Sequence, residues 1–76
     1  MRKDDIIRLF HMLEASNQAI QFTKDKSRND LDSDRKLVLA LVKAIEIIGE
    51  AAFQVSQPAR DELPSIPWED IVGMRH

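Results

Sequence analysis

Residues 34–56 read DRKLVLALVKAIEIIGEAAFQVS, and this stretch decides the fold. At about 100° per residue of an α-helix, its polar side chains gather on one narrow stripe, which Leu39 interrupts. The stripe consists of Lys36, Lys43, Glu46, Glu50, Gln54 and Gln57. Almost all the other side chains are Leu, Val, Ala, Ile or Phe, and a helix that is apolar over most of its circumference must be covered on several sides. The stretch therefore predicts the central helix of a bundle, a helix at a subunit interface, or both.

Gly49 stands inside this helix, where a glycine costs about 1 kcal/mol relative to alanine. We interpret the glycine as a point where another backbone segment approaches closely, with a ligand-binding role as the less favoured alternative. Gly49 therefore predicts that a second segment of protein packs against the middle helix.

A first long helix is predicted over residues 3–24. Its apolar side chains recur at steps of three and four, which places one set on a single face: Ile6, Leu9, Phe10, Leu13 and Ile20. Asp4 and Asp5 lie in the first turn, where the helix dipole favours acids. Asn17 interrupts the stripe, and we expect a partly buried amide that fixes register or bonds the backbone. His11 is expected to be a packing or surface residue.

Residues 25–33 are predicted to form a solvated polar connection, with Asp32 or Ser33 capping the next helix. The alternating acids Asp30, Asp32 and Asp34 copy the first ligand positions of a calcium loop. The remaining positions do not fit, because an Arg stands where such a loop needs Gly and a Leu where it needs a bidentate Glu. We therefore expect no calcium site.

The last quarter of the chain is divided by three prolines. A short helix is predicted over residues 58–63, followed by an extended connection bracketed by Pro64 and Pro67. Pro67 then opens a final helix that reaches the last residue without a stop signal, so we interpret this helix as incomplete. Trp68 and Ile71 are expected to anchor it to the bundle.

Length and composition limit the class of protein. A chain of 76 residues forms one domain, and so small a domain is of marginal stability, which favours a homodimer. The chain has no Cys, two His and a net charge of −2, so the sequence offers no metal-ligand cluster, no cofactor motif and no overall field that would attract nucleic acid. No apolar run reaches the roughly 18–20 residues needed to cross a membrane, and no signal peptide is visible. We expect a cytoplasmic protein that does not bind membranes.

Two stretches carry a family resemblance. Residues 44–52 read AIEIIGEAA and residues 66–75 read IPWEDIVGMR. Both are similar to segments of HepT-like proteins of the HEPN superfamily, the toxin ribonucleases of HepT/MntA-type toxin–antitoxin pairs. With the amphipathic first helix, the resemblance covers essentially the whole chain. It implies an all-α, antiparallel up-and-down helical bundle of HEPN type, of which residues 1–76 form the N-terminal portion with the last helix incomplete.

The resemblance also implies an active site, in which Arg75 opens a motif whose His follows four to six residues later. His76 is adjacent to Arg75 and cannot be that His, which would fall after residue 76. In the family a Tyr follows the motif His, and a nucleotidyltransferase is thought to attach AMP to it; this Tyr is absent from residues 1–76 as well. The implied activity is metal-independent RNA cleavage at a dimer cleft, with a nucleotidyltransferase antitoxin as partner and no cofactor. We expect the 76-residue chain to have little or no ribonuclease activity.

This chemistry is physically reasonable for a dimer. Cleavage through the neighbouring 2′-hydroxyl needs a base, an acid and cationic donors for the phosphate. His can exchange protons near neutral pH, and Arg remains charged and can hold phosphate oxygens in a bidentate manner. One Arg and one His are too few for all these roles, whereas two chains supply two of each. The alternative is a non-catalytic dimerisation or protein-interaction module that binds a partner helix or a nucleotidyltransferase through the middle helix.

Overall fold

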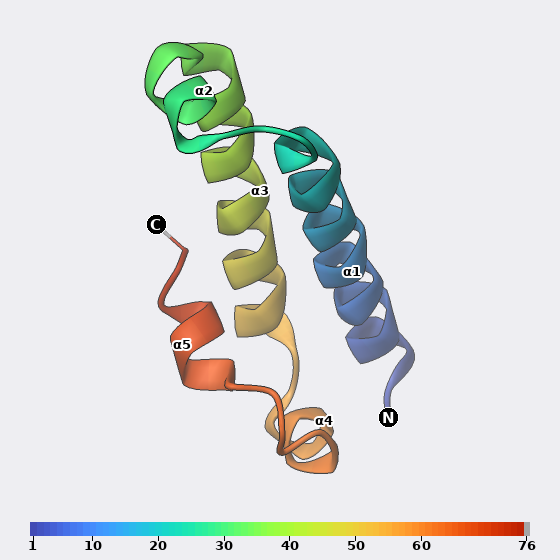
Figure 1. Cartoon of the computed structure of the whole chain (residues 1–76). Coiled ribbons are helices and arrows are strands. Elements are labelled where there is room, and N and C mark those ends of the chain that lie inside the picture. The colour runs from blue at the N-terminus through green and yellow to red at the C-terminus, as the bar shows by residue number, and fades with distance from the viewer. Residues whose placement is uncertain (76) are drawn as a thin grey trace.

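The computed structural model describes residues 1–75, and every regular element in that range is a helix (Figure 1). The elements are α1 (Lys3–Thr23), α2 (Arg28–Ser33), α3 (Arg35–Gln54), α4 (Gln57–Glu62) and α5 (Trp68–Val72). The long helices α1 and α3 form an antiparallel hairpin, and α5 lies against the side of α3 that faces away from α1 (Figure 1). The prediction of an all-α fold is confirmed. Within residues 1–75, no helix combines the length and the apolar character that a membrane span requires.

Small side chains bring the two long helices together. Ala15 of α1 and the alanines of α3, at positions 44, 51 and 52, are buried. Short side chains at a helix contact allow the two backbones to approach closely. A core cluster then forms where the hairpin meets α4 and α5, and it consists of Met12, Ala51, Ala52, Val55, Ala59 and Trp68. The most buried part of the molecule therefore lies at the end of the hairpin that carries the C-terminal segments.

The predicted packing face of α1 is largely wrong. Of the five apolar residues assigned to it, only Leu9 packs against the core cluster. The side chains of Phe10, Leu13 and Ile20 are 65%, 56% and 61% exposed, and Asn17 is exposed rather than partly buried. The reason is that the buried face of α1 is the one that carries Asp5, Met12 and Ala15, which lies at a different angle round the helix. The larger apolar residues remain on a second face of α1.

The predicted cover of α3 is present only in part in the single chain. α1 covers one side of the helix and α5 covers another. Large apolar side chains that neither helix hides are at least one third exposed: Val38, Leu39, Val42, Ile45, Ile47 and Phe53. The middle helix thus keeps apolar surface that a second protein could cover.

The connection after α1 is more ordered than predicted. Residues 28–33 form α2, which begins with a capping box: Asp30 N–H donates to the Ser27 hydroxyl, and Ser27 N–H donates to the Asp30 carboxylate. These bonds satisfy backbone donors that a helix start would otherwise leave free. Asp34, and not Asp32 or Ser33, caps α3 by accepting a hydrogen bond from Leu37 N–H at 3.1 Å.

The C-terminal segments also differ from the prediction in detail. The connection between Pro64 and Pro67 is a turn and not extended, because Ile66 N–H donates to the Leu63 carbonyl and Trp68 N–H donates to the Ile66 carbonyl. α5 ends at Val72 instead of continuing to the end of the chain. Trp68 is buried and its Nε1–H donates to the Leu63 carbonyl at 3.1 Å. Since Ile71 packs against the same core cluster, the predicted anchoring of this helix is confirmed.

One buried acid connects the start of α1 to the segment between α3 and α4. Asp5 of α1 is 3% exposed, and its carboxylate accepts hydrogen bonds from the backbone N–H of Ser56 at 2.8 Å and from its hydroxyl at 2.7 Å. Ser56 in turn caps α4 by accepting a bond from Ala59 N–H. The bonds from the Ser56 N–H and hydroxyl hold the pKa of Asp5 below its usual value of 3.8.

This contact makes stability depend on pH. Because the pKa of Asp5 is lowered in the folded state, its ionised form stabilises the fold above about pH 4 and loses that effect as pH falls through the lowered pKa. We expect Asp5→Asn to lower the thermal unfolding midpoint at pH 7, and the difference from wild type to shrink as the pH falls below about 4. Circular dichroism melts measure this, with Asp4→Asn at the neighbouring exposed position as the control. Equal midpoints of wild type and Asp5→Asn at pH 7 would contradict the assignment.

Candidate active site

Gly49 determines where Arg75 lies. After α5 the chain makes a turn through Gly73 and Met74, and Arg75 N–H donates to the Val72 carbonyl at 3.2 Å. The backbone of this turn rests directly on α3. A Cβ atom at Gly49 would lie 2.7 Å from the Arg75 nitrogen and 3.0 Å from the Ile71 carbonyl oxygen. The predicted close approach of a backbone segment at Gly49 is therefore confirmed, and the segment is the one that carries Arg75.

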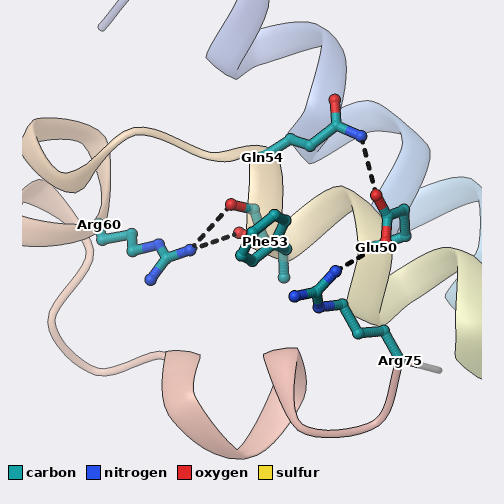
Figure 2. A network of polar contacts seen from close by, with 6 residues as sticks. Glu50, Phe53, Gln54, Arg60 and Arg75 are labelled. Atoms are coloured by element: carbon teal, nitrogen blue, oxygen red, sulfur yellow. Dashed lines mark hydrogen bonds and ion pairs between the residues drawn. The ribbon is translucent and has the colours of Figure 1, made fainter.

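The side chain of Arg75 is held by two residues of α3. Its guanidinium carbon lies 3.6 Å from the centroid of the Phe53 ring, and its Nη1 donates to Glu50 Oε2 at 3.4 Å. The carboxylate of Glu50 also accepts a bond from Gln54 Nε2 at 3.2 Å. Figure 2 shows the guanidinium between the ring and the carboxylate. Phe53 and Gln54 follow Glu50 by three and four residues, so all three project from the same face of the helix.

Beside this contact lies a hollow of about 140 Å³. Its lining residues come from α3 and from the C-terminal turn: Lys43, Glu46, Ile47, Glu50 and Arg75. The side chain of Arg75 is 36% exposed, so it faces both the protein and solvent. The hollow thus presents two cationic and two acidic side chains at the surface of the molecule.

Arg60 fixes the end of α3 from which Phe53 projects. It donates to the carbonyls of Ala52 at 3.0 Å, Phe53 at 3.2 Å and Val55 at 3.2 Å. These carbonyls belong to the last turn of α3 and to the residue that follows it, where the carbonyl groups lack the N–H partners of a continuing helix. The guanidinium of Arg60 also lies 5.7 Å from the Trp68 ring centroid. Arg60 therefore joins the end of α3 to α5, and Figure 2 shows it on the opposite side of Phe53 from Arg75.

Arg75, the site residue that the family resemblance implies, lies beside Glu50 of the polar stripe. The contacts of Phe53 with Arg75 and of Arg60 with the end of α3 were not predicted. Phe53 follows Glu50 by three residues on α3, and that spacing was the only signal in the sequence. His11 is exposed on α1, in a separate hollow beside Phe10 and Leu13, and His76 lies outside the described residues. Across residues 1–75, no three His, Asp or Glu side chains are close enough to hold a metal ion.

Comparison with known proteins shows which family the chain resembles. A family model described as "Ribonuclease HepT-like" matches residues 12–76. "Putative RNase MJ1380" of Methanocaldococcus jannaschii is 37% identical over 68 residues, which cover 90% of this chain and 62% of that protein. "Probable ribonuclease HepT" of Thermococcus cleftensis is 31% identical over 72 residues, which cover 95% of this chain and 60% of that protein. This chain therefore spans less than two thirds of either relative's length. No solved structure matches it.

The contact at Gly49 can be tested with the second glycine as a matched control. In Gly49→Ala the new methyl group collides with backbone atoms, which costs about 1–3 kcal/mol and outweighs the gain in helix propensity of about 1 kcal/mol. In Gly73→Ala the methyl group meets only carbonyl oxygens at 3.4 Å, and the backbone is right-handed.

We expect Gly49→Ala to lower the free energy of unfolding by up to about 2 kcal/mol, and Gly73→Ala to leave it unchanged or raise it by about 0.4–1 kcal/mol. Urea unfolding followed by the fluorescence of Trp68 measures both. A Gly49→Ala variant as stable as wild type would show that the C-terminal turn does not rest on α3.

Proposed function

Because the chain belongs to the ribonuclease HepT-like family, we propose that Arg75 is the phosphate-binding residue of a metal-independent endoribonuclease. The observation that carries the proposal is the state of the Arg75 side chain. Its guanidinium is stacked on Phe53 and bonded to Glu50, yet remains partly exposed beside a hollow. An arginine that only solvates the surface needs no such support.

In the proposed reaction, the 2′-oxygen of a ribose attacks the adjacent phosphorus and the 5′-oxygen of the next nucleotide leaves. A base takes the proton of the 2′-hydroxyl, and an acid gives a proton to the leaving oxygen. Arg75 stabilises the negative charge that grows on the phosphate oxygens in the transition state. The His that follows this Arg by four to six residues in the family fits the proton transfers, because imidazole titrates near neutral pH.

We place the active centre between two copies of the protein. Phosphodiester cleavage needs more charged and titrating groups than one Arg and one His provide. The exposed apolar side chains of α3, which include Leu39 and Val42, support an interface between two chains. In this proposal the protein is the toxin of a toxin–antitoxin pair, its substrate is RNA, and a nucleotidyltransferase is the antitoxin partner.

The gene sequence beyond the codon for His76 is the first test of this function. An in-frame His four to six residues after Arg75 is expected for the enzyme. In the protein that includes this His, we expect Arg75→Ala to lower the rate of RNA cleavage in the presence of EDTA by about 10²–10³. Arg75→Lys keeps the charge without the bidentate geometry, so it should recover only part of the rate.

Arg35→Ala, which removes an exposed arginine at the opposite end of α3, serves as the control and should cleave RNA like wild type. A wild-type rate for Arg75→Ala would exclude Arg75 from the reaction. Robust cleavage of RNA in EDTA by the 76-residue chain would contradict the need for the later His.

The shared active centre has its own test. Light scattering of the 76-residue chain is expected to give twice the monomer mass of 8.7 kDa, because α3 has apolar surface left uncovered by one chain. Leu39→Glu should shift the mass toward the monomer, since it puts a charge on that surface. A well-behaved wild-type monomer would count against an active centre built from two chains.

The second candidate function is a non-catalytic interaction module. The same exposed apolar surface favours it, because a patch of this kind commonly marks a site where proteins associate. A stop codon directly after His76, together with stable dimerisation and no cleavage of RNA, would favour the module over the enzyme.

A further inference from the structure

The supports of Arg75 suggest a role for two residues beyond the arginine itself. An arginine side chain has several rotatable bonds and loses much freedom when it binds a phosphate. In this structure that freedom is already restricted. The Phe53 ring covers one face of the guanidinium at 3.6 Å, and Glu50 accepts a bond from Nη1 at 3.4 Å.

The remaining part of the guanidinium is suited to a phosphate. Of its five N–H groups, only one on Nη1 donates to an acceptor among residues 1–75. The edge formed by Nε and Nη2 is the side-on edge that binds two oxygens of one phosphate. Since the Arg75 side chain is 36% exposed, the contacts with Phe53 and Glu50 fix the group without enclosing it.

The two supporting residues are themselves held. Glu50 accepts a hydrogen bond from Gln54 at 3.2 Å, and the Phe53 carbonyl accepts one from Arg60 at 3.2 Å. Gly49, which precedes Glu50 on α3, packs directly against the backbone of Arg75. Three contacts therefore restrict Arg75: its backbone packs against Gly49, its guanidinium stacks on Phe53, and its Nη1 bonds Glu50.

We propose that Glu50 and Phe53 are positioning residues, which orient the guanidinium of Arg75 so that its Nε–Nη2 edge meets the scissile phosphate. This inference rests on the proposed ribonuclease function. It assigns Phe53 the role of a platform, and Glu50 the role of a hydrogen-bond acceptor for Arg75 and not of the base that takes the proton of the 2′-hydroxyl.

The orientation is tested first without catalysis, by NMR on the 76-residue chain. A ring current shifts protons above an aromatic face upfield, so the Arg75 side-chain protons should be displaced upfield in wild type. The displacement should persist in Phe53→Tyr and disappear in Phe53→Leu. Phe10→Leu, a matched change of an exposed phenylalanine on α1, should leave it unchanged. Absence of the displacement in wild type would overturn the positioning role, whatever the ribonuclease activity.

The role in the reaction is tested in the protein that includes the later His. We expect Phe53→Leu to lower kcat/KM for RNA cleavage roughly tenfold, Phe53→Tyr to restore it, and Phe10→Leu to have no effect. Because Phe53 is 48% exposed, the unfolding midpoint of Phe53→Leu should change little. A wild-type kcat/KM for Phe53→Leu would overturn the proposal.

Glu50→Gln separates positioning from proton transfer, because the amide oxygen can still accept a bond from Arg75. We expect a loss of kcat/KM of tenfold or less and a pH–rate profile of unchanged shape, with Glu14→Gln on α1 as the control. A loss of a hundredfold or more together with a missing acidic limb would make Glu50 the base and overturn its assignment. If wild type shows the ring-current displacement and no cleavage, the proposed function fails while the orientation of Arg75 stands.

Discussion

The close contact between α3 and the backbone of Arg75 is the constraint on which the site depends. It exists because residue 49 has no side chain: any Cβ there would lie within 3.0 Å of backbone atoms of the C-terminal turn. With the turn at this distance, Glu50 can accept a hydrogen bond from the guanidinium of Arg75, and Phe53 can stack on it.

The contact at Gly49 is maintained by bonds at the end of the hairpin. Asp5 holds Ser56 and so fixes where the chain leaves α3 for α4. Arg60 then donates hydrogen bonds to carbonyls at the end of α3 and lies beside Trp68. The bond between Asp5 and Ser56 joins residues that are far apart in the sequence. The C-terminal segments are therefore positioned by directional bonds as well as by the small core cluster.

The sequence was informative where a pattern is local. The bounds predicted for the two long helices differ from α1 and α3 by at most two residues, because a helical period repeats over many positions. Gly49 was interpreted correctly because a glycine inside an apolar helix weakens that helix unless a closely packed segment compensates for it. The packing face of α1 was assigned wrongly, since apolar periodicity alone does not show that alanines make the closest contact. The contact of Phe53 with Arg75 and that of Arg60 with Trp68 depend on where the C-terminal segment lies, which no local pattern specifies.

Energetics suggest that the site is built for the orientation of Arg75 more than for stability. An exposed ion pair such as that of Arg75 with Glu50 contributes about 0–1 kcal/mol, and an exposed cation–π contact contributes about 0.5–1 kcal/mol. Gly49 costs the helix about 1 kcal/mol relative to alanine, so the three together contribute little to folding. Natural sequences depart from the locally most stable choice mainly at functional sites. An arginine held at this small net gain, with a side chain that is still partly exposed, fits the phosphate-binding role that we propose for it.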